Sequence, residues 1–385
     1  MPESAFDELP RLVQECGPAA AFSHLADLFR EQRDYHRLFD IRMLQRKHEL
    51  KLPLSRPSQL SDVPPDLRKQ VEETYVAAAR EAGNLYLKDG DLAAAWTYLS
   101  VIREPQTVAA ALEALPVPAH PDEKTEEVIH IALYQGVHPA KGLEMSLKLH
   151  GTCSTITSFD QSLPNLKPEQ RAECARLMVR HLYADLTDNV RRHVEQRISM
   201  LPPDASLREL IGGRDWLFEG SNYHIDVSHL NSVVRFARSI DAPAKELDLA
   251  LQLAEYGSKL DPQLQYPGDP PFDDFYPAHV QFFRVLLDRN RDEALRYFQE
   301  KLDHEPDEQD KPILAYVLVD LLIRCGKKAE AVDLAARYLT RVGDDARFSF
   351  ADLCREAGRL DVLQSVAREQ NDAVTFLGAL LSEKT

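Results

Sequence analysis

Apolar residues recur along most of the chain at intervals of three and four, which is the spacing of one face of an α-helix. Leu85, Leu92, Leu99 and Ile102 follow this periodicity among alanines. Strand-like alternation is nearly absent; only Ser154–Phe159 could form a short strand, with a loop as an equal alternative. The pattern therefore predicts an all-α protein. Helices are expected over residues 19–48, 68–86, 91–114, 123–149, 169–199, 226–240, 244–259, 278–302, 312–324, 328–341, 347–356 and 359–381.

Proline-bearing segments separate these helices, because proline removes a backbone donor and clashes with the preceding helical turn. Irregular stretches are expected at residues 53–65, 116–121 and 202–203. The longest is 266–277, which mixes four aromatic residues with three aspartates. A long ordered loop of this kind is typical of a lid or binding element. The alternative is that its aromatic rings only fill the core while its acids face water.

Small residues recur at fixed distances from aromatic, leucine and proline residues. The clearest case is the run 82–105, with Gly83, Tyr86, Gly90, Ala95 and Leu99. Parts of the pattern return as Ala250, Gly257 and Pro262, as Ala294, Phe298 and Pro306, and as Gly326 and Ala331. This spacing resembles the tetratricopeptide repeat, a helix–turn–helix unit of about 34 residues, mainly over residues 68–105 and 244–341.

The resemblance implies an α-solenoid, that is, a right-handed superhelix of helical hairpins. Repeat-like helices are expected in residues 1–120 and 244–385, and an irregular, histidine-rich helical segment in 121–243, all in one continuous stack. Stacked hairpins form an extended concave surface. The resemblance therefore implies a protein or peptide partner held in the concave groove, with no cofactor.

Composition narrows the classes of partner. The 385 residues are 44% hydrophobic and 28% charged, with a formal net charge of −16. This charge argues against nucleic acid and against an anionic membrane surface, both of which need a basic patch, and it favours basic or neutral ligands. The longest apolar run, Ile313–Ile323, is too short to span a bilayer. An odd number of cysteines (5), without C-x-x-C, together with an acidic start lacking a signal pattern, predicts a cytoplasmic protein.

Histidine is unevenly distributed, since eight of the 13 histidines lie in residues 120–230. His224, Asp226 and His229 stand together just before a helical run. Imidazole and carboxylate groups are ligands for divalent transition metals such as zinc, so these three residues are candidate metal ligands. The alternative is that Asp226 or Ser228 caps the helix that follows.

Two further groups could carry catalysis. His181 and Asp185 lie one helical turn apart on a polar stripe, where the alternative is an ordinary solvated face. His150 and Cys153 flank Gly151, and a cysteine activated by histidine would be a nucleophile, although such neighbours are common by chance. The sequence has no P-loop, dinucleotide-binding, zincin or hydrolase motif. Two hypotheses remain: a peptide-binding repeat protein, and a metal-dependent hydrolase or lyase whose site lies in the central segment.

Overall fold

The computed structural model describes residues 3–198, 200–340 and 348–382, and its regular secondary structure there is entirely helical. The predicted all-α class is therefore confirmed for these residues. The chain divides into two compact units, Met1–Leu166 and Lys167–Thr385. This boundary coincides with neither of those expected from the sequence, at 120/121 and 243/244. None of the described helices is both long and apolar enough to cross a bilayer.

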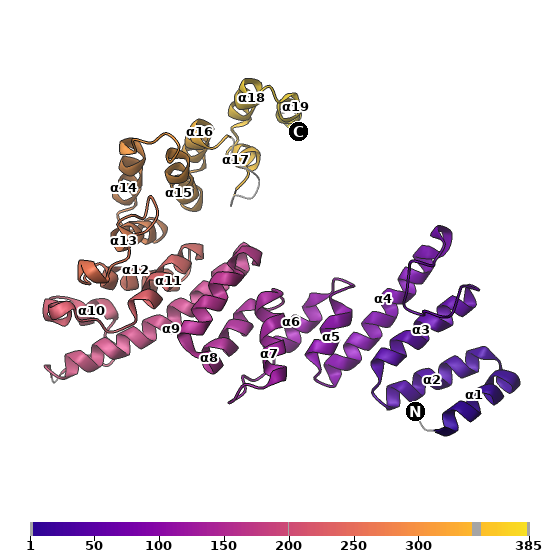
Figure 1. Ribbon diagram of the computed structural model, residues 1–385. Helices are drawn as coiled ribbons and strands as arrows, with labels where there is room; N and C mark the ends of the chain where they lie inside the picture. Colours follow the sequence, from indigo (N-terminus) through magenta and orange to yellow (C-terminus); the bar gives the residue numbers. More distant parts are fainter. Residues whose placement is uncertain (1–2, 199, 341–347, 383–385) are drawn as a thin grey trace. The chain divides into compact units, whose positions relative to one another are not determined.

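In the first unit, each helix packs mainly on the helices next to it in the sequence, as the run from α1 to α5 in Figure 1 shows. Its core is continuous from α2 to α8. The elements are α1 (Glu3–Cys16), α2 (Pro18–Glu31), α3 (Tyr35–Glu49), α4 (Pro65–Lys88), α5 (Leu92–Leu99), α6 (Pro105–Glu113), α7 (Glu123–Ile129), a π-helical turn (His130–Tyr134), α8 (Pro139–Ser162) and a 3₁₀ turn (Leu163–Asn165).

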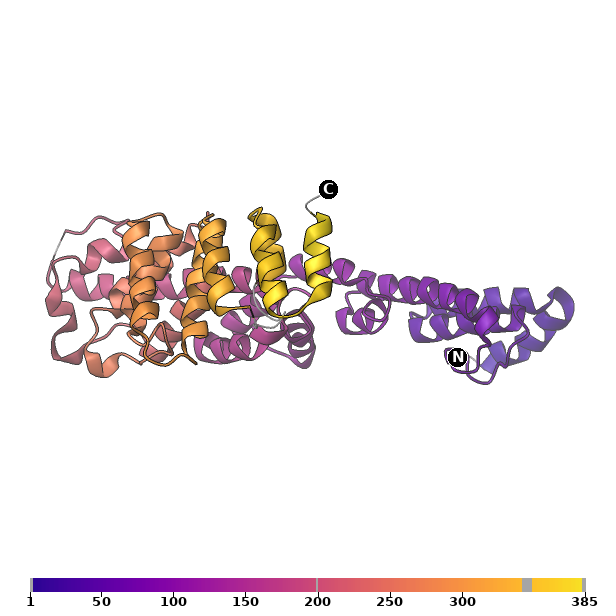
Figure 2. The same cartoon turned by 90° about the horizontal axis from the view of Figure 1, so that it is seen from above.

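The second unit begins with the long helix α9, against which α10, α11 and α12 pack. From α14 onward, neighbouring helices again follow one another, and they stand in a row in the orange-to-yellow part of Figure 2. The helices are α9 (Pro168–Glu195), α10 (Leu207–Ile211), α11 (Val227–Phe236), α12 (Glu246–Gly257), α13 (Phe275–Leu286), α14 (Arg291–His304), α15 (Lys311–Arg324), α16 (Lys328–Tyr338), α17 (Phe350–Glu356), α18 (Leu360–Glu369) and α19 (Ala373–Ser382). Short 3₁₀ turns cover Asp215–Ser221, Ala237–Ser239 and Pro262–Leu264.

Several hairpin turns share one geometry. A residue with positive φ ends the first helix, and the next backbone N–H donates to a carbonyl five residues earlier, which satisfies a group left open at the helix end. The positive-φ residue is Gly90 between α4 and α5 (φ 80°) and Gly326 between α15 and α16 (φ 83°), where glycine meets no steric penalty. The shared hydrogen bonds are Asp34 to Phe29, Asp91 to Tyr86, Lys327 to Leu322, Arg359 to Cys354 and Asp372 to Ala367, at 2.8–2.9 Å.

Glycine allows close helix contact at two crossings. A Cβ placed on Gly83 of α4 would lie 2.6 Å from Leu99 of α5. A Cβ on Gly257 of α12 would lie 2.3 Å from the ring of Tyr276 on α13. Leu99 and Tyr276 are fully buried. Both glycines belong to the spacing that suggested the repeat, and their function in the fold is to let a large neighbour reach the helix backbone.

Several predicted helices are in fact pairs. Residues 19–48 form α2 and α3, 91–114 form α5 and α6, 278–302 form most of α13 and α14, and 359–381 form α18 and α19. The two helices of a hairpin present their apolar faces to one core, so the periodicity continues across a short turn. Helix α1 was not expected, and Ser154–Phe159, the possible strand, lies within α8. Pro65 and Pro105 occupy the first positions of α4 and α6, where the N–H that proline lacks would have no helical partner in any case.

Candidate functional site

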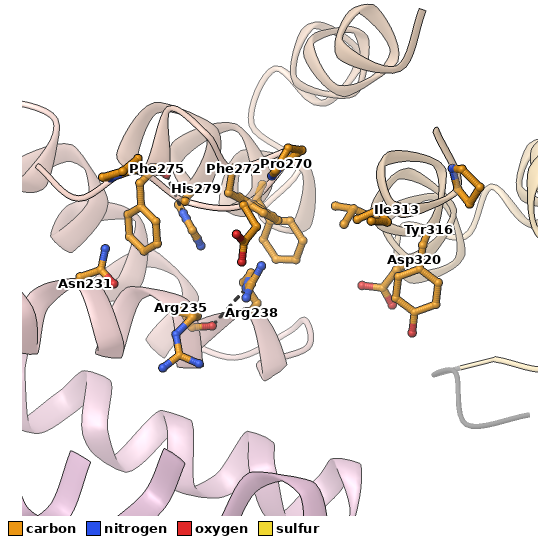
Figure 3. A pocket seen from close by; sticks show the side chains of 16 residues that line it. Asn231, Arg235, Arg238, Pro270, Phe272, Phe275, His279, Ile313, Tyr316 and Asp320 are labelled. Carbon is orange, nitrogen blue, oxygen red and sulfur yellow. Dashed lines mark hydrogen bonds between the residues drawn. The ribbon is translucent and has the colours of Figure 1, made fainter. Parts of the chain in front are cut away.

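A groove of about 740 Å³ lies in the second unit, between α11, the segment before α13, and α15. Three helices each contribute residues at spacing i, i+4, i+7 or close to it, which places each set on one helix face. The sets are Asn231, Arg235 and Arg238 from α11 and its extension, Phe275, His279 and Phe282 from α13, and Ile313, Tyr316 and Asp320 from α15. The rest of the lining consists of residues 267–270, Phe272, and Pro312 and Val317 of α15. Figure 3 shows His279 between Phe275 and Phe272, with the arginines near them and the α15 residues opposite.

The polar face of α11 follows from how this helix begins and packs. The Asp226 carboxylate accepts the backbone N–H groups of Ser228 (2.8 Å) and His229 (3.3 Å), and so caps the helix N-terminus. Leu230, Val233, Val234 and Phe236 are buried. Burial of that apolar face leaves Asn231, Arg235 and Arg238 directed toward the groove.

Both groove arginines are oriented by their surroundings. The Arg238 guanidinium lies 4.6 Å from the ring centroid of Phe272, and its Nε donates to the carbonyl of Arg235 at 3.3 Å. The Arg235 guanidinium lies 5.0 Å from the ring centroid of Phe236. Stacking on an aromatic face leaves the in-plane N–H donors of a guanidinium directed sideways. The groove therefore presents two held cations.

His279 is completely buried beside these cations. Its Nδ1 lies 2.6 Å from the carbonyl oxygen of Phe275, so Nδ1 carries the hydrogen and donates it. Its Nε2 has no hydrogen-bond partner among the described residues. Burial, together with the charges of Arg238 and Arg235, lowers the pKa of His279 to about 3. The ring is therefore neutral at physiological pH, and Nε2 presents a lone pair.

The two acidic residues of the groove lining, Asp320 and Asp269, differ in their surroundings. Asp320 accepts from Arg324 Nη1 at 3.2 Å, and Arg324 also pairs with Asp241 at 2.7 Å. Asp320 is thus held by a cation from its own helix. Asp269 is exposed in the loop at the edge of the groove. The groove lining therefore holds both acidic and basic side chains, and Arg238 is the cation that stacks on the aromatic wall.

The 266–277 segment is fixed to the helices beside it. Lys301 of α14 donates to Asp273 at 2.5 Å and to Asp274 at 2.6 Å, and the Tyr297 hydroxyl donates to Asp274 at 2.6 Å. Phe272 and Tyr276 are buried. Phe272, Phe275 and Tyr276 thus belong to the core and to the groove wall, whereas Tyr266 is exposed. Asp273 and Asp274 are paired with α14.

His224, one of the predicted metal ligands, belongs to a hydrogen-bonded cluster with His193 and Tyr256. The His224 backbone N–H donates to the Tyr256 oxygen at 2.9 Å, so the Tyr256 hydroxyl donates to His224 Nδ1, also at 2.9 Å. His224 Nε2 then carries its hydrogen and donates to His193 Nδ1, 2.8 Å away. Burial and the neighbouring His193 lower the pKa of His224 to about 4.

The predicted metal site does not form in the part of the chain that the structure describes, where no three or more histidine, cysteine or acidic residues are grouped to hold an ion. The reason is that the candidates have other partners. Asp226 caps α11, as the alternative interpretation expected, and His224 bonds to His193 and Tyr256. His229 contributes its backbone N–H to the same cap.

The other candidate residues lie apart from the groove lining. His181 Nε2 and Asp185 Oδ2 are 3.5 Å apart on a partly exposed face of α9. His150 pairs with Glu126 at 3.2 Å, in the first unit. Cys153 is exposed, beyond a kink at Gly151 in α8. None of the four lines the groove.

Acidification provides a test of the buried imidazole. The pKa of His279 is lowered by folding, so below pH 6.5 the unfolded chain binds a proton that the folded chain excludes, and stability falls as the pH decreases toward 3. Between pH 7.5 and pH 5 we expect wild type to lose about 2 kcal/mol more than His279→Phe. Urea unfolding at the two pH values measures the difference, and the paired carboxylates, common to both proteins, cancel. Equal losses in the two proteins would contradict a neutral, buried His279.

Sequence reasoning overlooked Arg235, Arg238 and His279, although the 266–277 segment, which it named as a possible lid or binding element, supplies part of the groove lining. The histidine-rich region covers residues 120–230, and His279 lies outside it. A signal was nevertheless present, because Arg235 and Arg238 share a helix face close in sequence to an aromatic-rich loop.

Comparison of the chain with family models, with curated proteins and with solved structures gives no match.

Proposed function

We propose that this protein is a helical-repeat protein of the α-solenoid type that binds a peptide segment of a protein partner in the groove between α11, α13 and α15. The observation that carries the proposal is the construction of the groove, in which held arginines and an unpartnered buried imidazole nitrogen stand beside an aromatic wall. Pockets with an apolar lining and a few fixed polar groups are typical of binding sites.

The repeated hairpin turn supports the repeat character of the protein. The same backbone hydrogen bond closes turns in both units, and small residues lie where helices cross. Proteins built from such hairpins commonly bind partners on extended surfaces. The groove is open along α15, where Ile313 is 54% exposed, so a chain segment can lie across it.

Peptide binding can be tested with the full chain immobilised against a display library of random peptides. We expect enriched peptides to bind wild type, and Ile313→Glu to weaken them about tenfold or more, because a charge replaces an exposed apolar contact in the groove. Val374→Glu is the matched control, since Val374 is also exposed (83%) but lies on α19. Fluorescence anisotropy of a labelled peptide measures both affinities. Failure to enrich any peptide, or equal affinity for the two variants, would refute the proposed function.

A further inference from the structure

The groove lining contains a buried acceptor without a donor. His279 Nδ1 donates its hydrogen to the Phe275 carbonyl, so the neutral ring has only a lone pair at Nε2, and no described residue donates to it. In Figure 3 the imidazole points from α13 toward Arg235 and Arg238. Buried polar atoms are nearly always hydrogen-bonded, and an unsatisfied one in a native protein needs an explanation. A bound group that brings one N–H or O–H donor to Nε2 would supply the missing bond.

The donor that fits this position is uncharged. The positive charges of Arg238 and Arg235 help to lower the pKa of His279 to about 3, because they disfavour a further positive charge at the ring. An ammonium or guanidinium group of a ligand at Nε2 would meet the same repulsion. This repulsion depends only on where the two arginine charges lie, whatever other groups they contact. The donor therefore comes from a neutral group.

The surroundings of the imidazole favour an aromatic donor. The His279 ring centroid lies 4.5 Å from that of Phe272 and 4.3 Å from that of Phe275. A backbone amide would bring its carbonyl into these apolar surroundings, and a hydroxyl would bring its own lone pairs, each of which would then need a donor. The indole of tryptophan combines one N–H donor and no acceptor with a large apolar ring. It therefore satisfies Nε2 without leaving a new acceptor unsatisfied.

The groove has space for such a ring. Its volume of about 740 Å³ lies within the range of pockets that hold small ligands. Ile313, which is 54% exposed, offers apolar contact on the opposite side. Because Nε2 is closed to water, the indole reaches it after a shift of a neighbouring side chain. Side-chain changes of this kind are common when interfaces form.

A partner peptide that contains tryptophan carries all of these features. We propose that the groove binds a tryptophan side chain of such a peptide, with the indole N–H donating to His279 Nε2. This inference rests on the proposed function and specifies its partner. An uncharged indole is in keeping with the preference for basic or neutral ligands that the net charge of the chain suggests.

The composition of the peptides enriched from the library tests the choice of side chain. We expect a shared tryptophan, and about tenfold weaker binding when it is replaced by benzothienylalanine, in which sulfur takes the place of the indole N–H. This comparison needs only the wild-type protein. Enrichment of peptides without tryptophan would overturn this inference while leaving peptide binding itself intact. Displacement of the peptide by N-acetyltryptophanamide at equal concentration would also overturn it, since the site would then take a small indole compound.

The role of His279 has its own test. Removal of the indole N–H should weaken binding about tenfold for wild type and for His304→Phe, but not for His279→Phe, which lacks the acceptor. His304 is the matched control, because its Nδ1 also lies 2.6 Å from the carbonyl oxygen four residues earlier, while its side chain is exposed on α14. Thermal unfolding checks that both variants are folded. Equal losses for wild type and His279→Phe would overturn the assignment of Nε2 as the acceptor.

Discussion

Replacing Lys47 with methionine is expected to lower the free energy of unfolding by about 1–3 kcal/mol, the cost of leaving the hydrogen-bond acceptors around a buried ammonium without their donor. Lys47 of α3 is completely buried. Its three ammonium donors are satisfied by the carbonyls of Arg56 and Gln59, each at 2.7 Å, and by Asp62 at 3.0 Å. Methionine fills similar space but leaves these three acceptors without their donor. The pKa of Asp62, which the Lys47 ammonium holds low, should rise toward its usual value.

The two tryptophans allow the loss of stability in Lys47→Met to be assigned to one of the two units. Trp96 lies in the first unit and Trp216 in the second, so urea unfolding followed by Trp96 fluorescence in a Trp216→Phe background reports the first unit. Lys69→Met is the matched control, because Lys69 is exposed on α4, and it should change stability by less than about 0.5 kcal/mol. A Lys47→Met protein as stable as this control would show that the network contributes nothing.

Replacing Gly257 with alanine is expected to destabilise the second unit by about 2–3 kcal/mol, near the upper end of the range for overpacking. The added Cβ would lie 2.3 Å from a ring carbon of Tyr276, which is fully buried and therefore has little room to move. Alanine is the better helix former, by about 1 kcal/mol. Gly257→Ala is therefore destabilising only if the clash with Tyr276 costs more free energy than the higher helix propensity of alanine gains.

Substitution of a second glycine separates the effect of helix propensity from that of the steric clash. Gly378 lies in α19, where an added Cβ meets nothing within 4 Å, so Gly378→Ala should keep only the helix-propensity gain and stabilise by about 0.5–1 kcal/mol. Urea unfolding followed by Trp216 fluorescence in a Trp96→Phe background measures Gly257→Ala, and circular dichroism measures Gly378→Ala. The same sign for both substitutions would contradict the packing argument at Gly257.

Helical periodicity was sufficient to predict the class of fold and the position of most helices, because each helix buries one apolar stripe. Periodicity did not predict where the turn lies between the two helices of a hairpin. The turn at residues 287–290, for example, is formed by Asp288 and Asn290 with positive φ, and its flanking apolar residues continue the pattern. Positive φ at a residue other than glycine has no clear signature in a single sequence.

The candidate site was less predictable for a different reason. Sequence reasoning selected residues that are close together along the chain, such as His224, Asp226 and His229. In the structure, Asp226 caps the N-terminus of α11 by accepting backbone N–H groups of residues that follow it. The groove instead joins α11, α13 and α15, and Arg235 lies 44 residues before His279. His193 likewise reaches His224 from another element. Such juxtapositions depend on which helix faces meet, and periodicity alone does not specify the partner of a face.

The order in which helices contact one another has a consequence for folding kinetics. In the first unit, partners such as α3 and α4, or α4 and α5, are adjacent in the sequence, so their contacts close short loops. In the second, α9 must meet α12, with α10 and α11 between them in the chain. Folding rates fall as contacts become more distant in sequence. We therefore expect the Trp96 signal to appear before the Trp216 signal when the denatured chain is diluted into buffer.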